Sequence, residues 1–524
     1  MLGFFVLLFV FANFNELTAR NPCAKQFYTP SGGDDVAFGC ICDANYCDDI
    51  EPLGVIQSDA FVAYVSSEKA DRLDRIDYHF TGFPNTSNIV QIDASKTYQK
   101  IFGFGGAMTD AAGVNLVSLS QPVRDRLLQQ YYGPNSIDYR FTRVPMASCD
   151  FSTREYSYAD VAGDFDLVNF NLTQEDFQLK IPFIKQAQAL VAQLGDTLKL
   201  FTTAWSAPGW MKDSGSMKGG GRLIGEVNGK YYQTLANYYK RFFEEYHKLG
   251  IDFWGVTPEN EPTAGLDPNY RWQAMYLSDE MERDWIKGVL GPTLRGSDVT
   301  KDLKIMIGDD QRGIYPKWAD TIFSDPDAAK YVDGMALHWY EDLFVSEKGI
   351  AETTSKYPDK FMLATEACTG FFPWEQNVLP GNWKRAEMYA LDIIEDLRSG
   401  VVGWIDWNLV LDQIGGPNWV NNTVDAAIIA NATVDQFLKQ PMYYALGHFS
   451  AFIKPDYKRI DVKLDLHQVD GVAFVAPDGK QRVLVMLNRN KNDVSFSIQD
   501  QKNSVRYGNV LLEGRSMKTI IWNM

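Results

Sequence analysis

Residues 253–262 read F-W-G-V-T-P-E-N-E-P, an apolar strand pattern that stops abruptly at two acids, an amide and two prolines. A continuous apolar run of this kind is typical of a parallel strand that is covered on both faces. Longer segments with apolar residues every three to four positions, such as 180–194 and 231–246, separate these runs and predict helices. Between about residues 99 and 408 the pattern predicts eight strands, at 101–106, 141–146, 198–204, 253–257, 303–308, 332–337, 360–365 and 401–406.

Eight β-α units close as a (β/α)8 TIM barrel, so the predicted class is α/β. After about residue 455 the sequence changes to period-two segments around the turn P-D-G-K at 477–480, which predicts an antiparallel β-sandwich. Residues 20–98 are too few for a robust core and are expected to join that sandwich. The predicted organisation is a signal peptide (1–19), an N-terminal disulfide-containing β segment that packs with the C-terminal β domain (20–98), the catalytic barrel (99–440) and the C-terminal β-sandwich (441–524).

The chain begins with an apolar stretch from Leu2 to Ala12, followed by polar residues. This pattern predicts a secretory signal peptide that is cleaved near Ala19. No later apolar run reaches the length needed to cross a membrane. The formal net charge of −17 at pH 7 makes nucleic acid a poor partner. We therefore expect a soluble mature protein that enters the secretory pathway.

Four of the six cysteines lie close together at 23, 40, 42 and 47. In a secreted chain they predict two disulfides, and Cys23 with Cys40 and Cys42 with Cys47 is the most local of three possible pairings. A zinc site is a weaker interpretation, because C-x-C lacks the usual CxxC spacing and no histidine is near. Glycosylation sequons fit the same compartment and occur at Asn85, Asn171, Asn421 and Asn431.

Polar and aromatic residues follow the predicted strands, at the ends where barrel enzymes gather their catalytic groups. Two of them are acids on different strands, Glu261 after the fourth and Glu366 after the seventh. Cleavage of a glycosidic bond requires such a pair, since one carboxyl protonates the leaving oxygen while the other attacks or activates water. Further candidates for holding a sugar or orienting the acids are Asp110, Arg143, Trp205, Asn260, His338, Tyr340, Trp407 and Asn422.

Each candidate also has a structural explanation. Asp110 begins T-D-A-A and could cap a helix, Arg143 could be an ion-pair partner, and His338 is better explained as a hydrogen-bonded scaffold than as a base. Motifs of other chemistries are missing: the sequence has no G-x-S-x-G, no phosphate-binding G-x-x-x-x-G-K-[ST] and no H-E-x-x-H. Neither a catalytic metal nor a cofactor is expected.

Nine blocks of sequence, taken together and in order along almost the whole chain, resemble the animal lysosomal acid β-glucosidases, or glucosylceramidases, of glycoside hydrolase family 30. The blocks are G-F-G-G-A-M-T-D-A-A (103–112), R-V-P-M-A-S-C-D-F-S (143–152), E-N-E-P (259–262), D-D-Q-R (309–312), H-W-Y (338–340), T-E-A-C (365–368), D-W-N-L (406–409), G-G-P-N-W-V (415–420) and Q-P-M-Y-Y-A-L-G-H-F-S (440–450).

The resemblance implies a retaining exo-β-glucosidase that hydrolyses glucosylceramide in sphingolipid breakdown. It implies that Glu261 is the acid/base, with Glu259 in support, and that Glu366 is the nucleophile. The pKa of Glu261 is expected to be raised by partial burial and by the charge of Glu366. By the same resemblance the glucose pocket contains Asp110, Trp205, Asn260, Trp407 and Asn422, with Tyr340 and Arg143 beside the nucleophile.

The resemblance also implies the lysosome lumen as the location, a lipid surface carrying the substrate, and a saposin-like activator protein with anionic lipid as partners. Two residues depart from the family pattern, Pro258 in place of Ala and Glu341 in place of an apolar residue. The alternatives are a glycosidase for another β-linked sugar or a sterol glucoside, and a non-catalytic glycolipid-binding relative.

Overall fold

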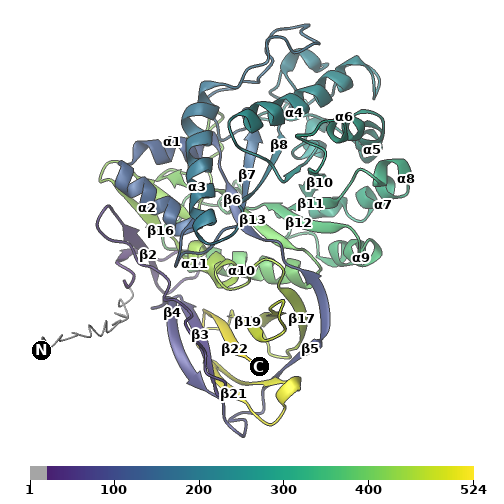
Figure 1. The fold of residues 1–524 in the computed structure, drawn as a ribbon. Helices are drawn as coiled ribbons and strands as arrows, with labels where there is room; N and C mark the ends of the chain where they lie inside the picture. The colour runs from purple at the N-terminus through teal and green to yellow at the C-terminus, as the bar shows by residue number, and fades with distance from the viewer. Residues whose placement is uncertain (1–20) are drawn as a thin grey trace, which may run out of the picture.

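The computed structural model describes residues 21–524, so the predicted signal peptide lies outside the described residues. Eight parallel strands form a closed barrel in the order β6 to β13, with β13 pairing back onto β6 (Figure 1). Each strand falls on an apolar run predicted from the sequence, so the predicted TIM barrel is confirmed. The strands are β6 (Gly103–Ala107), β7 (Phe141–Met146), β8 (Lys199–Ala204), β9 (Gly255–Val256), β10 (Lys304–Gln311), β11 (Gly334–His338), β12 (Phe361–Glu366) and β13 (Gly403–Asn408).

Amphipathic helices cover the outside of the barrel (Figure 1). In α4, Tyr239, Phe242 and Tyr246 recur every three to four residues and are all buried. The helices are α1 (Asp110–Ser118), α2 (Gln121–Tyr132), α3 (Ile181–Gln193), α4 (Lys230–Lys248), α5 (Asp279–Trp285), α6 (Gly291–Arg295), α7 (Lys317–Phe323), α8 (Pro326–Ala329), α9 (Lys348–Lys356), α10 (Trp383–Arg398) and α11 (Pro441–Ser450), with π-helical turns η1 (Asp176–Lys180) and η4 (Ile286–Leu290).

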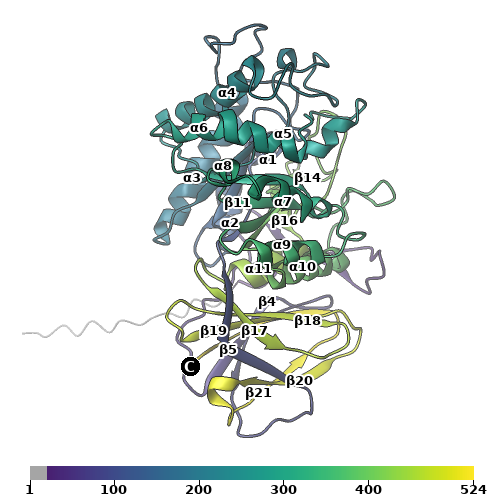
Figure 2. The same ribbon diagram turned by 90° about the vertical axis from the view of Figure 1, so that its right-hand side faces the viewer.

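A nine-stranded sheet forms the second domain, in the order β21-β20-β5-β17-β18-β19-β22-β3-β4. It combines β3, β4 and β5 of the N-terminal segment with strands from the C-terminal region. Helices α10 and α11 lie between this domain and the barrel (Figure 2). The strands are β3 (Ala60–Ser67), β4 (Arg72–His79), β5 (Ile89–Lys100), β17 (Lys458–Lys463), β18 (Val469–Val475), β19 (Gln481–Asn488), β20 (Val494–Asp500), β21 (Gly508–Leu512) and β22 (Ser516–Asn523).

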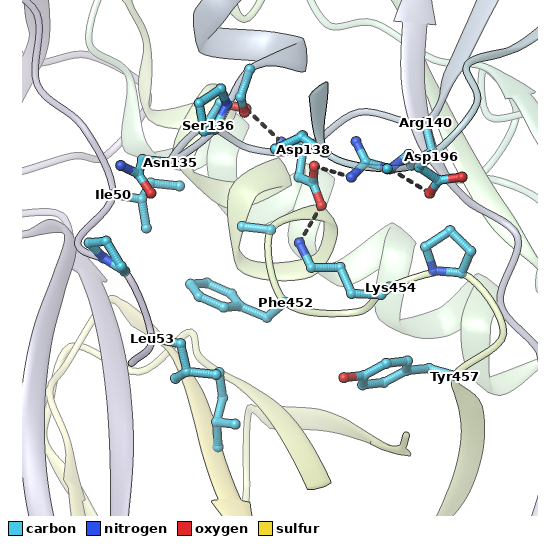
Figure 3. A pocket seen from close by; sticks show the side chains of 18 of the residues that line it. Ile50, Leu53, Asn135, Ser136, Asp138, Arg140, Asp196, Phe452, Lys454 and Tyr457 are labelled. Carbon is cyan, nitrogen blue, oxygen red and sulfur yellow. Dashed lines mark hydrogen bonds and ion pairs between the residues drawn. The ribbon is translucent and has the colours of Figure 1, made fainter. Parts of the chain in front are cut away.

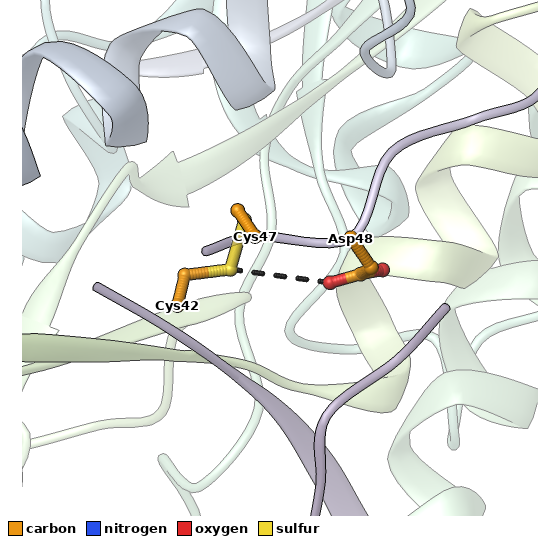
Figure 4. A group of neighbouring side chains, drawn as sticks. All are labelled: Cys42, Cys47 and Asp48. Carbon is orange, nitrogen blue, oxygen red and sulfur yellow. Dashed lines mark hydrogen bonds between the residues drawn. A yellow bond between two sulfur atoms is a disulfide. The ribbon is translucent and has the colours of Figure 1, made fainter. Parts of the chain in front are cut away.

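The cysteine-rich start of the chain lies in a separate five-stranded sheet, in the order β1-β2-β16-β15-β14. The disulfides are Cys23–Cys40 and Cys42–Cys47, the local pairing among the three that the sequence allowed. Figure 4 shows Asp48 beside the second disulfide, and because both sulfurs are bonded to each other they are not free to ligate zinc. The strands are β1 (Lys25–Tyr28), β2 (Ala37–Cys42), β14 (Leu411–Asp412), β15 (Ile428–Asn431) and β16 (Gln436–Lys439).

A cavity of about 570 Å³ lies where the amino ends of the barrel strands meet the β domain (Figure 3). Four of its charged groups are paired with one another: Asp138 bridges Arg140, at 2.5 Å, and Lys454, while Arg140 also contacts Asp196 at 2.9 Å. These ion pairs connect the start of β7 to the segment after α11. No helix among residues 21–524 is long and apolar enough to cross a membrane.

Close backbone contact between β6 and β7 gives one stability prediction. A Cβ atom on Gly105 would lie 2.2 Å from the carbonyl oxygen of Phe141, a backbone atom that cannot move aside within the barrel. We expect Gly105→Ala to lower the free energy of unfolding by about 2–3 kcal/mol, measured by thermal unfolding. Gly82→Ala is the control, since nothing lies within 4 Å of that Cβ position. Equal midpoints for the two variants contradict the prediction.

Candidate active site

A pocket of about 340 Å³ opens at the carboxyl ends of the barrel strands. It brings together most of the residues singled out in the sequence, including both glutamates. Asp110, Arg143 and His338 do not line it. The lining residues are Asp150, Phe151, Trp205, Asn260, Glu261, Tyr270, Trp272, Gln311, Tyr340, Glu341, Glu366, Cys368, Phe371, Trp407, Asn422 and Val424.

The two glutamates face each other across the pocket. Glu261, Glu366 and His338 each offer one ligand atom, and these three atoms all lie within 4.8 Å of one another. One carboxylate oxygen of Glu261 thus lies within 4.8 Å of one of Glu366, a proximity that fits the carboxyl separation of about 5–5.5 Å typical of retaining glycosidases better than the 6.5 Å or more of inverting enzymes. The geometry therefore suits direct attack by one carboxylate on a sugar.

Backbone irregularities aim these groups inward. Glu261 has a φ of 44°, in the left-handed region, and begins the short 3₁₀ helix η3 (Pro262–Leu266). Asp309 has a φ of 57° and lies at a register shift between β10 and β11. A second shift, between Leu337 and His338, pairs His338 with Glu366. Left-handed backbone at non-glycine residues costs energy and is concentrated at functional sites, where bulges redirect side chains.

Each glutamate has its own set of hydrogen-bond donors. Glu366 accepts from the Arg143 guanidinium and, at 2.7 Å, from the Tyr340 hydroxyl. Glu261 contacts three groups, the Gln311 amide at 2.8 Å, His338 Nδ1 at 3.1 Å and the Tyr270 hydroxyl at 3.2 Å.

Beneath the pocket, the buried carboxylate of Asp309 connects the cations of the site. It accepts from Arg143 at 2.8 Å and contacts His338 Nε2 at 3.2 Å, with the hydroxyls of Thr257 and Thr365 completing its shell. Burial alone raises the pKa of Asp309, but the charge of Arg143 and the hydrogen bond from His338 outweigh it, so its pKa is lowered. Asp309 therefore stays ionised.

His338 is held as a fixed cation. Burial alone lowers the pKa of this histidine, but the charge of Glu366 and the hydrogen bonds to Asp309 and Glu261 raise it to about 10. The expectation that His338 is a hydrogen-bonded scaffold agrees with these contacts. Glu261, His338 and Glu366 are close enough to hold a metal ion, but His338 uses both ring nitrogens on carboxylates and Arg143 already neutralises Glu366. The arrangement fits a metal poorly.

The pKa values of the two glutamates differ from expectation. Burial raises the pKa of Glu366, and the charges of His338 and Arg143 offset only part of this rise. Burial acts on Glu261 too, but hydrogen bonds from His338 and Tyr270 outweigh it and lower the pKa of Glu261. The predicted rise for Glu261 is therefore wrong for the substrate-free site. Because the two acids interact, they titrate as a pair.

Aromatic and amide side chains form the rest of the pocket. Trp205 and Trp407 stack with ring centroids 5.3 Å apart, and the Arg143 guanidinium lies 4.9 Å from the centre of the Trp205 ring. Asn260 accepts from Arg143 at 2.8 Å through its carbonyl oxygen, which leaves its amide N–H groups for a ligand. These groups offer flat apolar faces and directional donors, as a sugar ring requires.

Asp110 lies behind the pocket wall and not in its lining. It is buried, with Lys180 of η1 at 3.2 Å and hydrogen bonds from Ser152 and Tyr156 at 2.6 and 2.9 Å. Its neighbour Thr109 is the residue that caps α1. Glu259 is also buried and outside the lining, and burial raises its pKa well above the usual range, against the charge of Lys212.

Asp150, Tyr270 and Gln311 line the pocket, although no role was assigned to them from the sequence. Asp150 lines the pocket and accepts from Asn422 at 2.9 Å and from Asn418 at 3.3 Å. Burial and the charges of the two glutamates raise its pKa to about 7, against the effect of the Asn422 hydrogen bond. The available signal was its position four residues after strand β7, in the block R-V-P-M-A-S-C-D-F-S.

Comparisons with known proteins match both domains of the chain. Residues 101–453 match the glycosyl hydrolase family 30 TIM-barrel domain, and residues 458–520 match the family 30 beta sandwich domain. The chain is 50% identical to putative glucosylceramidase 4 of Caenorhabditis elegans over 88% of both chains. It is 42% identical to lysosomal acid glucosylceramidase of Mus musculus over 92% of this chain and 93% of that protein. The crystal structure of SrfJ from Salmonella typhimurium superposes with a TM-score of 0.81 at 28% identity, covering 89% of this chain and all of that one.

The contacts of Asp309 with Arg143 and His338 give a prediction about the charges of the site. In Asp309→Asn, His338 loses a carboxylate partner, so we expect its pKa to fall from about 10 toward the ordinary value. NMR titration of 15N-labelled histidine side chains measures this shift. We also expect kcat/KM on an aryl β-glucoside to fall at least about tenfold, because Arg143 and His338 are no longer held together. An unchanged pKa for His338 contradicts the assigned role of Asp309.

Proposed function

Because the chain belongs to glycoside hydrolase family 30, we propose that it is a retaining β-glucosidase that hydrolyses glucosylceramide to glucose and ceramide. The observation that carries the proposal is the close pair of carboxylates of Glu261 and Glu366, with one oxygen of each within 4.8 Å of the other, in a pocket with stacked tryptophans. The identity to relatives named glucosylceramidase supports the choice of substrate.

In the first step, the Glu366 carboxylate attacks the anomeric carbon while Glu261 donates its proton to the glycosidic oxygen. The bond to ceramide breaks, ceramide leaves as the alcohol, and a glucosyl ester forms on Glu366. Arg143 and Tyr340 orient the attacking carboxylate and stabilise its charge. In the second step, Glu261, now ionised, removes a proton from water, which attacks the same carbon and releases glucose with retained configuration and a free Glu366 carboxylate.

The first step requires the proton of the coupled pair to be on Glu261. A bound glucose covers Glu366 and excludes water around Glu261, which raises the pKa of that acid. Meanwhile the direct contacts from Arg143 and Tyr340 favour the ionised form of Glu366. Acidic surroundings, as in a lysosome, further favour the protonated acid. The charges that the first step requires, a protonated Glu261 and an ionised Glu366, are therefore reached when substrate binds and not in the empty pocket.

Glucose hydroxyls are held by the pocket wall. We assign to Asp150 the hydroxyl-binding role that the sequence analysis gave to Asp110, since Asp150 lines the pocket and Asp110 pairs with Lys180 behind it. Asn422 fixes the Asp150 carboxylate at 2.9 Å. Asn260 lies next to Glu261 in the chain and offers its amide to the sugar, while Trp205 and Trp407 cover the ring.

An apolar rim beside the pocket supports a lipid-borne substrate. We define the rim as Leu343, Phe344, Phe372 and Trp374. Leu343, Phe344 and Trp374 are 65–72% exposed, and Phe372 stacks on Trp374 at 4.5 Å. The rim continues into the pocket through Phe371, which lines it and packs on Phe372 at 4.1 Å. Exposed aromatic groups of this kind insert into lipid surfaces.

The setting proposed for this reaction is the lysosome lumen, reached through the secretory pathway. The two disulfides fit an oxidising route of synthesis, and of the four sequons Asn85, Asn171 and Asn421 are exposed while Asn431 is half-buried. A saposin-like activator with anionic lipid is the proposed partner. The net charge of −17 opposes docking on anionic lipid at neutral pH, and protonation of carboxylates at lysosomal pH relieves this repulsion.

Mass spectrometry after treatment with a 2-fluoro-β-glucoside bearing a good leaving group tests the mechanism. We expect a slowly hydrolysing glucosyl ester on the peptide containing Glu366, because the fluorine slows both steps and the leaving group rescues only the first. Glu366→Gln is the control that removes the label. A label on another acid, or none on the folded wild-type protein, shifts the assignment to another nucleophile, another sugar or a binding protein.

The rim gives a separate prediction, which concerns activity on a substrate held in a lipid surface. Replacing two exposed aromatic residues, in Phe344→Ser/Trp374→Ser, is expected to lower activity on glucosylceramide in vesicles at least about fivefold, because lipid contact is lost. The rim lies outside the pocket lining, so hydrolysis of a soluble aryl β-glucoside serves as the reference reaction. Equal losses on both substrates speak against a lipid-docking rim.

A further inference from the structure

One wall of the catalytic pocket carries an acid that the mechanism does not use. Glu341 lines the pocket, follows Tyr340 in the chain and is exposed to solvent. It lies on the side of the acid/base: the Tyr340 N–H donates to Gln311 at 3.0 Å, and Gln311 donates to Glu261 at 2.8 Å. Since Glu261 protonates the leaving oxygen, Glu341 lies beside the space that the aglycone enters.

The backbone holds Glu341 in a fixed turn. Its carbonyl oxygen accepts from the N–H groups of Phe344 at 2.8 Å and Val345 at 2.9 Å, and the Asp342 N–H donates to Trp339 at 3.0 Å. The Asp342 side chain forms an ion pair with buried Arg312. One carboxylate oxygen of Glu341 lies against Gly313, 2.8 Å from where a Cβ atom on that residue would be. The acid is therefore positioned by the fold and is not part of a loose loop.

The carboxylate of Glu341 has no partner of its own. Among residues 21–524 it has no hydrogen bond or ion pair. Arg312, the chain neighbour of Gly313, is directed to Asp342, Asp392 and Asp396 instead. Together with Glu261 and Glu366 it makes the pocket rich in carboxylates, whereas Arg143 and His338 are buried behind the lining. A ligand that brings a positive charge to this wall is favoured.

We propose that Glu341 is a specificity-determining residue that favours glucolipids whose aglycone carries a free, protonated amine over those whose nitrogen is a neutral amide. This inference rests on the proposed function. In a 1-O-glucosyl sphingoid base, the amine is separated from the glycosidic oxygen by two carbon atoms, so it lies close to the acid/base when the bond is cleaved. Attraction between the amine and Glu341 then adds to binding in the transition state, while an N-acyl group removes the charge and adds bulk at the same wall.

The test compares two lipids that differ only at the nitrogen, glucosylsphingosine and its N-acetyl derivative, in the same neutral detergent micelles at acidic pH. The quantity measured is the ratio of kcat/KM for the amine to kcat/KM for the amide. We expect this ratio to fall about fivefold in Glu341→Gln and further in Glu341→Lys. The wild-type ratio is also expected to fall as sodium chloride is raised, because salt screens the attraction.

Glu352→Gln is the matched control, since Glu352 is an exposed acid on α9 that does not line the pocket, and it should keep the wild-type ratio. A ratio that is the same in wild type and Glu341→Gln, with both lipids hydrolysed, overturns this inference and leaves the proposed function standing. Hydrolysis of an aryl β-glucoside but of neither lipid overturns both the lipid substrate and this inference. A ratio that falls in Glu341→Gln but not in Glu352→Gln supports the assignment.

Discussion

A buried guanidinium determines the arrangement of the catalytic centre. Arg143 projects from β7 and is completely buried, so its charge must be neutralised within the protein. It binds Glu366 at the end of β12, Asp309 in β10 and Asn260 after β9, and lies over Trp205 after β8. One cation on β7 thus contacts groups from four other strands of the barrel, and only a closed barrel brings those strand ends within its reach.

The strands and the two glutamates could be predicted from sequence because both follow from local patterns. Apolar runs mark strands that are covered on both faces, and acids at strand ends point to chemistry in a barrel. The choice between Asp110 and Asp150 could not be predicted in this way. Both acids follow barrel strands, but Asp110 pairs with Lys180 outside the lining whereas Asp150 lines the pocket. The lowered pKa of Glu261 depends in the same way on distant contacts, from His338 and Tyr270.

Several residues of the active site lie where the backbone departs from regular strand geometry. Glu261 and Asp309 both have left-handed backbone, and His338 follows a register shift. Regular strands would direct successive side chains alternately inward and outward, so adjacent residues could not both serve the pocket. The bulges allow Asp309 to contact Arg143 while its neighbour Asp310 accepts from Thr263 at the base of η3. Single-sequence patterns do not reveal such shifts, because they depend on which strand is paired alongside.

The nine-stranded sheet has a consequence for how the molecule is made. Strand β5, close to the start of the chain, pairs with β17 and β20, and β3 pairs with β22, the last strand of all. During synthesis from the N-terminus, β3 and β4 can pair with each other, but β5 and the second edge of β3 have no partner until the whole barrel has been translated. Their apolar faces and unpaired edges must be shielded for that time. Nascent chains of this protein are therefore expected to depend on chaperones, and truncation within the last strands leaves the earliest ones without a sheet to join.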